Sequence, residues 1–268
     1  MKFVALVCAL AVTAAQAADF KETARGVAEK SGPSAIMVRI VSALKMEFQG
    51  QNMNQEQKSE VAATIIDPSG LTVSSASALE PATLMKRMLR GMKLDTTIKE
   101  TTFILADGTE VPAEIVMKDT DLDMAFLMPK EAGKTFPAVE LKAATAQPKV
   151  LDDVFLVGRM GKEGNRAVHV DTGMIRSIVK GPRTYYVCSA EVSQHAGRIV
   201  STPDGSPLGL VVTKMAPGGD GDEGGDEMGL GMLFSMGAKD NMPLPIVRPV
   251  DDLIEAAKQA KDAKAKKK

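Results

Sequence analysis

The chain has 268 residues, with 33 Lys and Arg against 34 Asp and Glu, and a formal net charge of -1. This balance argues against a general nucleic-acid binder. Trp is absent and Tyr occurs only at Tyr185 and Tyr186, which disfavours surfaces that stack sugars or bases on aromatic rings. A chain of this size buries ~70–75% of its unfolded surface, enough for a full core without disulfides.

The first residues predict export. A basic start at Lys2 precedes an apolar run over residues 3–13, and Ala15 and Ala17 have the small-x-small spacing of a cleavage site. We therefore expect a signal peptide over residues 1–17 and a periplasmic or secreted mature protein. No later stretch approaches ~20 apolar residues, so no membrane span is expected.

Apolar spacing predicts helices over residues 19–30, 80–93 and 249–261, and an exposed Gln- and Asn-rich loop over residues 50–58. Short strands separated by turn signals are expected between them. They cover residues 34–48, 61–66, 71–75, 101–105, 110–117, 124–128, 154–158, 167–178, 184–189, 198–200, 208–213 and 230–234. Because strands and helices do not alternate regularly, the pattern indicates an all-β barrel or sandwich.

Three segments in a fixed order carry the candidate catalytic positions. Residues 61–79 read VAATIIDPSGLTVSSASAL, residues 119–127 read DTDLDMAFL, and residues 193–210 read SQHAGRIVSTPDGSPLGL. They resemble, respectively, the histidine, aspartate and serine segments of the HtrA/Deg-type trypsin-like serine proteases. The resemblance implies an all-β fold, a trypsin-like double β-barrel with short N-terminal and C-terminal helices.

The resemblance places Ser77 at the family's histidine, Asp123 at its aspartate and His195 at its serine. A serine nucleophile needs an adjacent imidazole as base, and the hydroxyl of Ser77 does not accept protons near neutral pH. The oxyanion-equivalent loop holds Ser193 and Gln194, with Ser193 where the family has a glycine. The expected consequence is a degenerate triad without ordinary peptidase activity.

Each position also has a simpler interpretation. Asp123 is either a solvated carboxylate or a buried one satisfied by Ser77, and His195 either lines the substrate groove or lies in a surface loop. His169 lies between two valines in a predicted strand, which favours a structural role. With two histidines and Cys188 as the one cysteine of the expected mature chain, we expect no His/Cys transition-metal site and no cofactor.

Two charged segments complete the predicted organisation. An acidic, Gly-rich loop over residues 216–229 offers weak calcium candidates, namely Asp220, Asp222 and Asp226, but lacks EF-hand spacing and is more typical of a solvated loop. Residues 259–268 form a basic, Lys-rich tail that we expect to be disordered. The double-barrel domain is expected over residues 18–258, with no sequence left for a PDZ domain.

Three functions follow from these expectations. The first is an exported, non-catalytic protease homologue, or pseudoprotease, that binds a peptide or protein. The second is an active serine endopeptidase with a non-standard or misaligned site, such as Ser77 paired with His195. The third is a structural subunit of an exported assembly, and the oligomeric state is left open.

Overall fold

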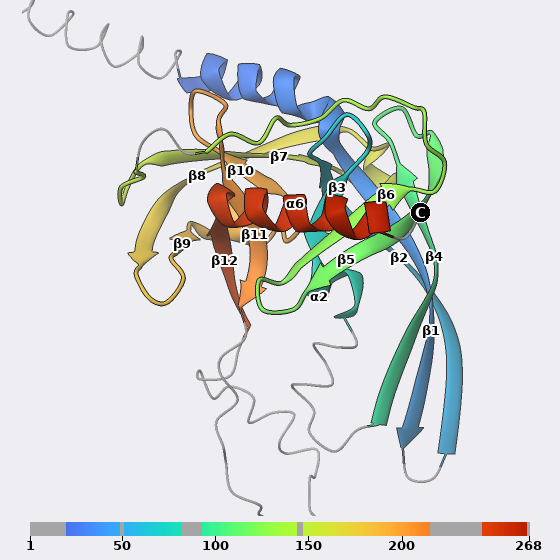
Figure 1. Cartoon of the computed structure of the whole chain (residues 1–268). Helices are drawn as coiled ribbons and strands as arrows, with labels where there is room; N and C mark the ends of the chain where they lie inside the picture. Colours follow the sequence, from blue (N-terminus) through green and yellow to red (C-terminus); the bar gives the residue numbers. More distant parts are fainter. Residues whose placement is uncertain (1–19, 49–50, 82–92, 144–146, 215–242, 267–268) are drawn as a thin grey trace, which may run out of the picture.

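Strands dominate the computed structural model of the chain, which describes residues 20–48, 51–81, 93–143, 147–214 and 243–266 (Figure 1). Six strands close the first antiparallel barrel in the order β1-β2-β3-β6-β5-β4. They are β1 (Ala35–Phe48), β2 (Gln51–Ile65), β3 (Thr72–Ser75), β4 (Lys93–Ile104), β5 (Glu110–Asp119) and β6 (Met124–Pro129).

Six further strands close the second barrel in the order β10-β11-β12-β9-β8-β7. They are β7 (Asp153–Arg159), β8 (Val168–Val179), β9 (Tyr185–Cys188), β10 (Ile199–Ser201), β11 (Pro207–Lys214) and β12 (Leu244–Pro249). This architecture confirms the expected trypsin-like double β-barrel.

Helices lie mainly at the two ends of the described chain. Residues 20–31 are helical and run into the short η1 (Gly32–Ser34), while α6 (Val250–Lys266) crosses over the barrels in Figure 1. Three short turns of helix lie in connections: α2 (Ala76–Leu79), η2 (Lys162–Gly164) and α4 (Ala190–Ser193). The helices expected at both ends are therefore confirmed.

The loop expected over residues 50–58 is wrong. Residues 51–58 belong to β2, whose register runs along all of β1 and pairs, for example, Leu44 with Gln55, while residue 50 lies outside the described part of the chain. The far ends of β1, β2 and β4 extend from the barrel as a ribbon in Figure 1. Gln and Asn predict exposure there, but backbone pairing with β1 satisfies the main chain and makes a strand.

Two other expectations have different outcomes. Of the helix expected over residues 80–93, residues 82–92 lie outside the described part of the chain, and Lys93 begins strand β4. The basic tail is helical rather than disordered through Lys266, because α6 continues beyond residue 258. Lys261 and Lys264 of this part of α6 form ion pairs with Asp67 and Glu114 of the first barrel.

The core holds the two barrels and α6 together. One cluster of buried side chains combines Phe126 of β6, Leu210 of β11 and Leu253 of α6. The N-terminal helix packs on the second barrel, where Val27 contacts the cluster around Phe155. A shared apolar core of this kind fixes the relative position of residues that the two barrels contribute to one site.

Among the described residues, no helix has both the length and the apolar character needed to cross a bilayer.

Candidate functional site

Asp123 lies where the two barrels meet. It precedes β6 with a left-handed backbone conformation, φ 56°, which Asp tolerates better than most residues. Its side chain is buried, with 9% of the residue exposed. A buried carboxylate at this place requires hydrogen-bond donors around it.

Both carboxylate oxygens of Asp123 have such donors. The Ser77 backbone N–H donates to Oδ1 at 2.7 Å, and the Ser77 hydroxyl donates to Oδ2 at 3.0 Å. Oδ2 also accepts from the Ser75 hydroxyl at 2.7 Å and from the Thr213 backbone N–H at 2.8 Å. Of the two interpretations of Asp123, the buried carboxylate satisfied in part by Ser77 is therefore the one that the structure shows. The hydrogen bond from Thr213 of β11 also connects Asp123 to the second barrel.

The local sequence explains how Ser77 reaches Asp123. Ser75 is the N-cap of α2, and its hydroxyl accepts from the Ala78 N–H at 3.2 Å. The helical turn that starts there directs the Ser77 N–H and hydroxyl back to the carboxylate. The Ala76 N–H donates to the Asp123 carbonyl at 3.0 Å, which fixes the two segments further.

The loop that carries His195 also lies against the first barrel. Gly197, two residues later, has φ 88°, and a Cβ there would overlap the Ala62 carbonyl oxygen and lie 2.7 Å from Ser74 Oγ. Only glycine allows this approach. The Gly197 N–H donates to the Val211 carbonyl at 2.8 Å, so the loop is held by both barrels.

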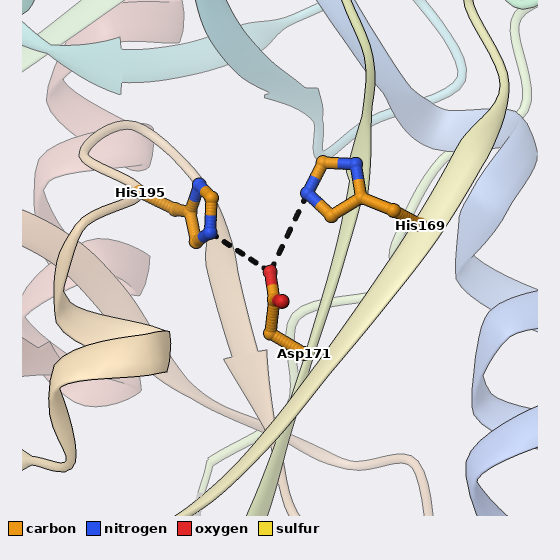
Figure 2. A group of neighbouring side chains, drawn as sticks. All are labelled: His169, Asp171 and His195. Atoms are coloured by element: carbon orange, nitrogen blue, oxygen red, sulfur yellow. Dashed lines mark ion pairs between the residues drawn. The ribbon is translucent and has the colours of Figure 1, made fainter. Parts of the chain in front are cut away.

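The His195 side chain nevertheless belongs to a second group of residues (Figure 2). His195 Nε2 lies 2.8 Å from Asp171 Oδ2, and His169 Nε2 lies 3.4 Å from the same oxygen. His169 and Asp171 share one side of β8 because they are two residues apart in a strand. We call His169, Asp171 and His195 the His-Asp-His cluster.

Arg198 contacts both imidazoles of this cluster. Its Nη1 hydrogen-bonds His169 Nε2 and lies 3.4 Å from His195 Nδ1, while Nη2 donates to the Arg159 carbonyl at 2.9 Å. A guanidinium only donates, so the two facing imidazole nitrogens are acceptors. The proton of neutral His195 therefore lies on Nε2, towards Asp171.

Burial sets the charge state of the cluster. Burial, followed by the nearby charge of Arg198, lowers the pKa of His169 and of His195 below their usual value. Burial also lowers the pKa of Arg198 to about 10, against the opposing effect of Asp171. At neutral pH the cluster thus has two neutral imidazoles between one carboxylate and one guanidinium.

The structure brings Ser77 and Asp123 together but leaves His195 in the other group. Within the described residues, no hydrogen bond or ion pair joins His195 to Ser77 or Asp123. Ser193 is the last residue of α4, and Gln194 is exposed in the turn that follows. The weak calcium candidates, Asp220, Asp222 and Asp226, lie outside the described residues.

Sequence reasoning missed three participants: Asp171, Arg198 and Thr213. The sequence His169-x-Asp171 in a predicted strand does signal two side chains on one face. No local pattern signals that the loop after α4 brings His195 and Arg198 to that face. We expected no His/Cys metal site because the chain has only two histidines. The fold, however, places both histidines beside Asp171.

The His-Asp-His cluster has the donor types of a metal site. One ligand atom from each residue lies within 4.8 Å of the others. A separate open depression of about 450 Å³ lies between the turn after β2, residues 138–141 and α6, and none of the candidate site residues lines it.

The arrangement of two antiparallel barrels with a buried aspartate at their junction defines the class of double-barrel, trypsin-like folds. The family model of the trypsin-like peptidase domain matches residues 62–210, more than half of the chain. The chain belongs to this family. No curated protein sequence matches the chain at a significant level.

Proposed function

We propose that this protein is an exported, non-catalytic member of the trypsin-like peptidases, similar to the HtrA/Deg type, that binds extended peptides or unfolded protein segments. The proposal rests first on one observation. The carboxylate of Asp123 accepts four hydrogen bonds, from hydroxyl and backbone groups, and none from an imidazole. Without an imidazole oriented by this carboxylate, a serine hydroxyl has no base to activate it.

His195 does not supply the missing base in this arrangement. Its Nε2 faces Asp171 and its Nδ1 faces Arg198, so neither nitrogen offers a lone pair to a hydroxyl proton. The Asp171–His195 contact is the observation that would favour a second candidate, an endopeptidase with a non-standard site. That candidate requires Arg198 to leave His195 Nδ1 before the imidazole can act as a base.

Loss of triad members lowers the rate by about 10⁶-fold in enzymes of this kind. The test is labelling with a fluorophosphonate probe, with an active trypsin-like protease as positive control. We expect no labelled serine by peptide mass mapping. Labelling of Ser77, Ser193 or any other serine would overturn the non-catalytic proposal.

An unpaired strand edge supports the binding part of the proposal. Residues 168–173 of β8 pair with β7, whereas β9 pairs with β8 only at residues 175–179. Among the described strands, none pairs with the second edge of residues 168–173. Such an edge is the template for strand addition by an extended peptide.

Exposed Val168 begins β8 and provides a specific variant for the binding test. We expect Val168→Asp to weaken binding of permanently unfolded, carboxymethylated α-lactalbumin, measured by biolayer interferometry. Val150→Asp changes a comparably exposed valine outside the strands and serves as the matched control. Absence of binding, together with elution only as a large complex, would favour a structural subunit instead.

A further inference from the structure

The geometry points to a binding site for a divalent transition metal ion of the zinc type, formed by His169, Asp171 and His195. The site lies outside the Asp123 group and does not depend on the proposed peptide binding. Two imidazoles and one carboxylate are ligands that Zn²⁺ takes in proteins. The chain contains only these two histidines, and the fold brings both to one carboxylate oxygen.

The distances between donor atoms suit such an ion. Tetrahedral Zn²⁺ with bonds of about 2.0–2.1 Å places its ligand atoms about 3.3 Å apart. His169 Nε2 lies 3.4 Å from Asp171 Oδ2, and His195 Nε2 lies 2.8 Å from it. One ligand atom from each of the three residues lies within 4.8 Å of the other two, so modest side-chain movements would bring all three to the spacing that the ion requires.

The site lies close to solvent. The side chains of His169, Asp171 and His195 are 25%, 27% and 28% exposed, while Asp171 Oδ2 itself is buried and has no hydrogen-bond partner among the described residues. A buried carboxylate oxygen without such a partner is one that a metal ion would satisfy. Figure 2 shows both rings directed at the carboxylate from different segments. Neutral imidazoles and an ionised carboxylate are the forms that coordinate a metal.

Arg198 is the competitor in this site. Its Nη1 already places a positive charge against His169 Nε2 and near His195 Nδ1. Gly158 leaves the space for it, since a Cβ there would overlap the guanidinium. Metal binding requires Arg198 to withdraw, and the His195 proton then moves from Nε2 to the vacated Nδ1.

The test follows both imidazoles of the full chain by ¹⁵N NMR during titration with ZnCl₂. Because there are only two histidines, each signal is assigned by a single variant. We expect both signals to shift, with one ion bound per chain by equilibrium dialysis. The Arg198→Gln variant should bind at least about tenfold more tightly, because the competing charge is gone.

The ligand variants Asp171→Asn and His169→Gln should each weaken binding by at least about tenfold. Asp153→Asn, an exposed carboxylate on the neighbouring β7, is the matched control and should bind as the unmodified chain does. Binding of Co²⁺ gives an independent readout through its visible absorption.

Three results would overturn the site. The first is an absence of histidine shifts in both the unmodified chain and Arg198→Gln. The second is binding by Arg198→Gln alone, which would mean that Arg198 excludes the metal from the native protein. The third is binding that persists unchanged in Asp171→Asn, which would assign the ion to other carboxylates.

Discussion

Ser77 holds the carboxylate of Asp123 with two hydrogen bonds, from its backbone N–H at 2.7 Å and from its hydroxyl at 3.0 Å. These are the residues that the family resemblance places at the histidine and aspartate positions. The carboxylate that orients a base in an active peptidase is here satisfied by a hydroxyl and by backbone groups of both barrels. Under the proposed function, we expect its role in this chain to be structural.

Replacing Asp123 with Ala should strongly destabilise the fold. The substitution leaves the Ser75 hydroxyl, the Ser77 N–H and the Thr213 N–H without their acceptor in a buried place. We expect a loss of about 3 kcal/mol in the free energy of unfolding, measured by urea denaturation. The exposed Asp121→Asn is the control, and an equal loss in both variants would contradict the structural role.

The two serines should contribute unequally. Ser77→Ala removes one of four hydrogen bonds to Asp123 and should cost about 1 kcal/mol in the free energy of unfolding. Ser75→Ala also removes the N-cap of α2, so it should cost about 2 kcal/mol. A larger loss for Ser77→Ala in the same denaturation experiment would show that the order is wrong.

The contact between Asp67 and Lys261 predicts a pH-dependent attachment of α6. Partial burial alone would raise the pKa of Asp67, but hydrogen bonds from Lys261 and Ser69 lower it to about 2. Since the folded pKa lies below the ordinary 3.8, this stabilisation is present above pH 3.8 and is lost as pH falls towards 2.

Asp67→Asn should therefore lower the free energy of unfolding by less than ~1 kcal/mol near neutral pH, because the pair is partly exposed. The difference from the unmodified chain should disappear on acidification through this window, as followed by urea denaturation at several pH values. Asp262→Asn, an exposed carboxylate on the same helix, should behave as the unmodified chain throughout. A difference for Asp67→Asn that grows on acidification would contradict the assignment.

The thiol of Cys188 should be unreactive in the folded protein. Burial raises the pKa of this thiol to about 11, so only about one molecule in a thousand carries the thiolate near ~pH 8. Iodoacetamide should label Cys188 slowly in the native state and rapidly in urea, as read by peptide mass mapping. Rapid native labelling would show that the strand β9 is not packed as described.

The all-β class was predictable because alternating apolar residues and turn signals are local in sequence, whereas the double barrel was predicted from the resemblance of three segments to a known family. The local signals failed at residues 51–58, where pairing with strand β1, and not the residues' own polarity, determines the conformation. For Asp123 the sequence left two interpretations open, a solvated carboxylate and a buried carboxylate satisfied by Ser77. The structure shows the second. The contact of His195 with Asp171 was not predictable, since the closed second barrel brings these residues together from separate segments.

The central claim is that the triad-equivalent residues belong to two separate groups, Ser77 with Asp123 and His195 with Asp171. Imidazole ¹⁵N NMR of the full chain tests it directly, because the signals of only two histidines need assignment. In variants that remain folded by circular dichroism, Asp171→Asn should shift the His195 signals and Asp123→Asn should leave them in place. A His195 signal that responds to Asp123→Asn and not to Asp171→Asn would instead restore a catalytic pairing and contradict the account.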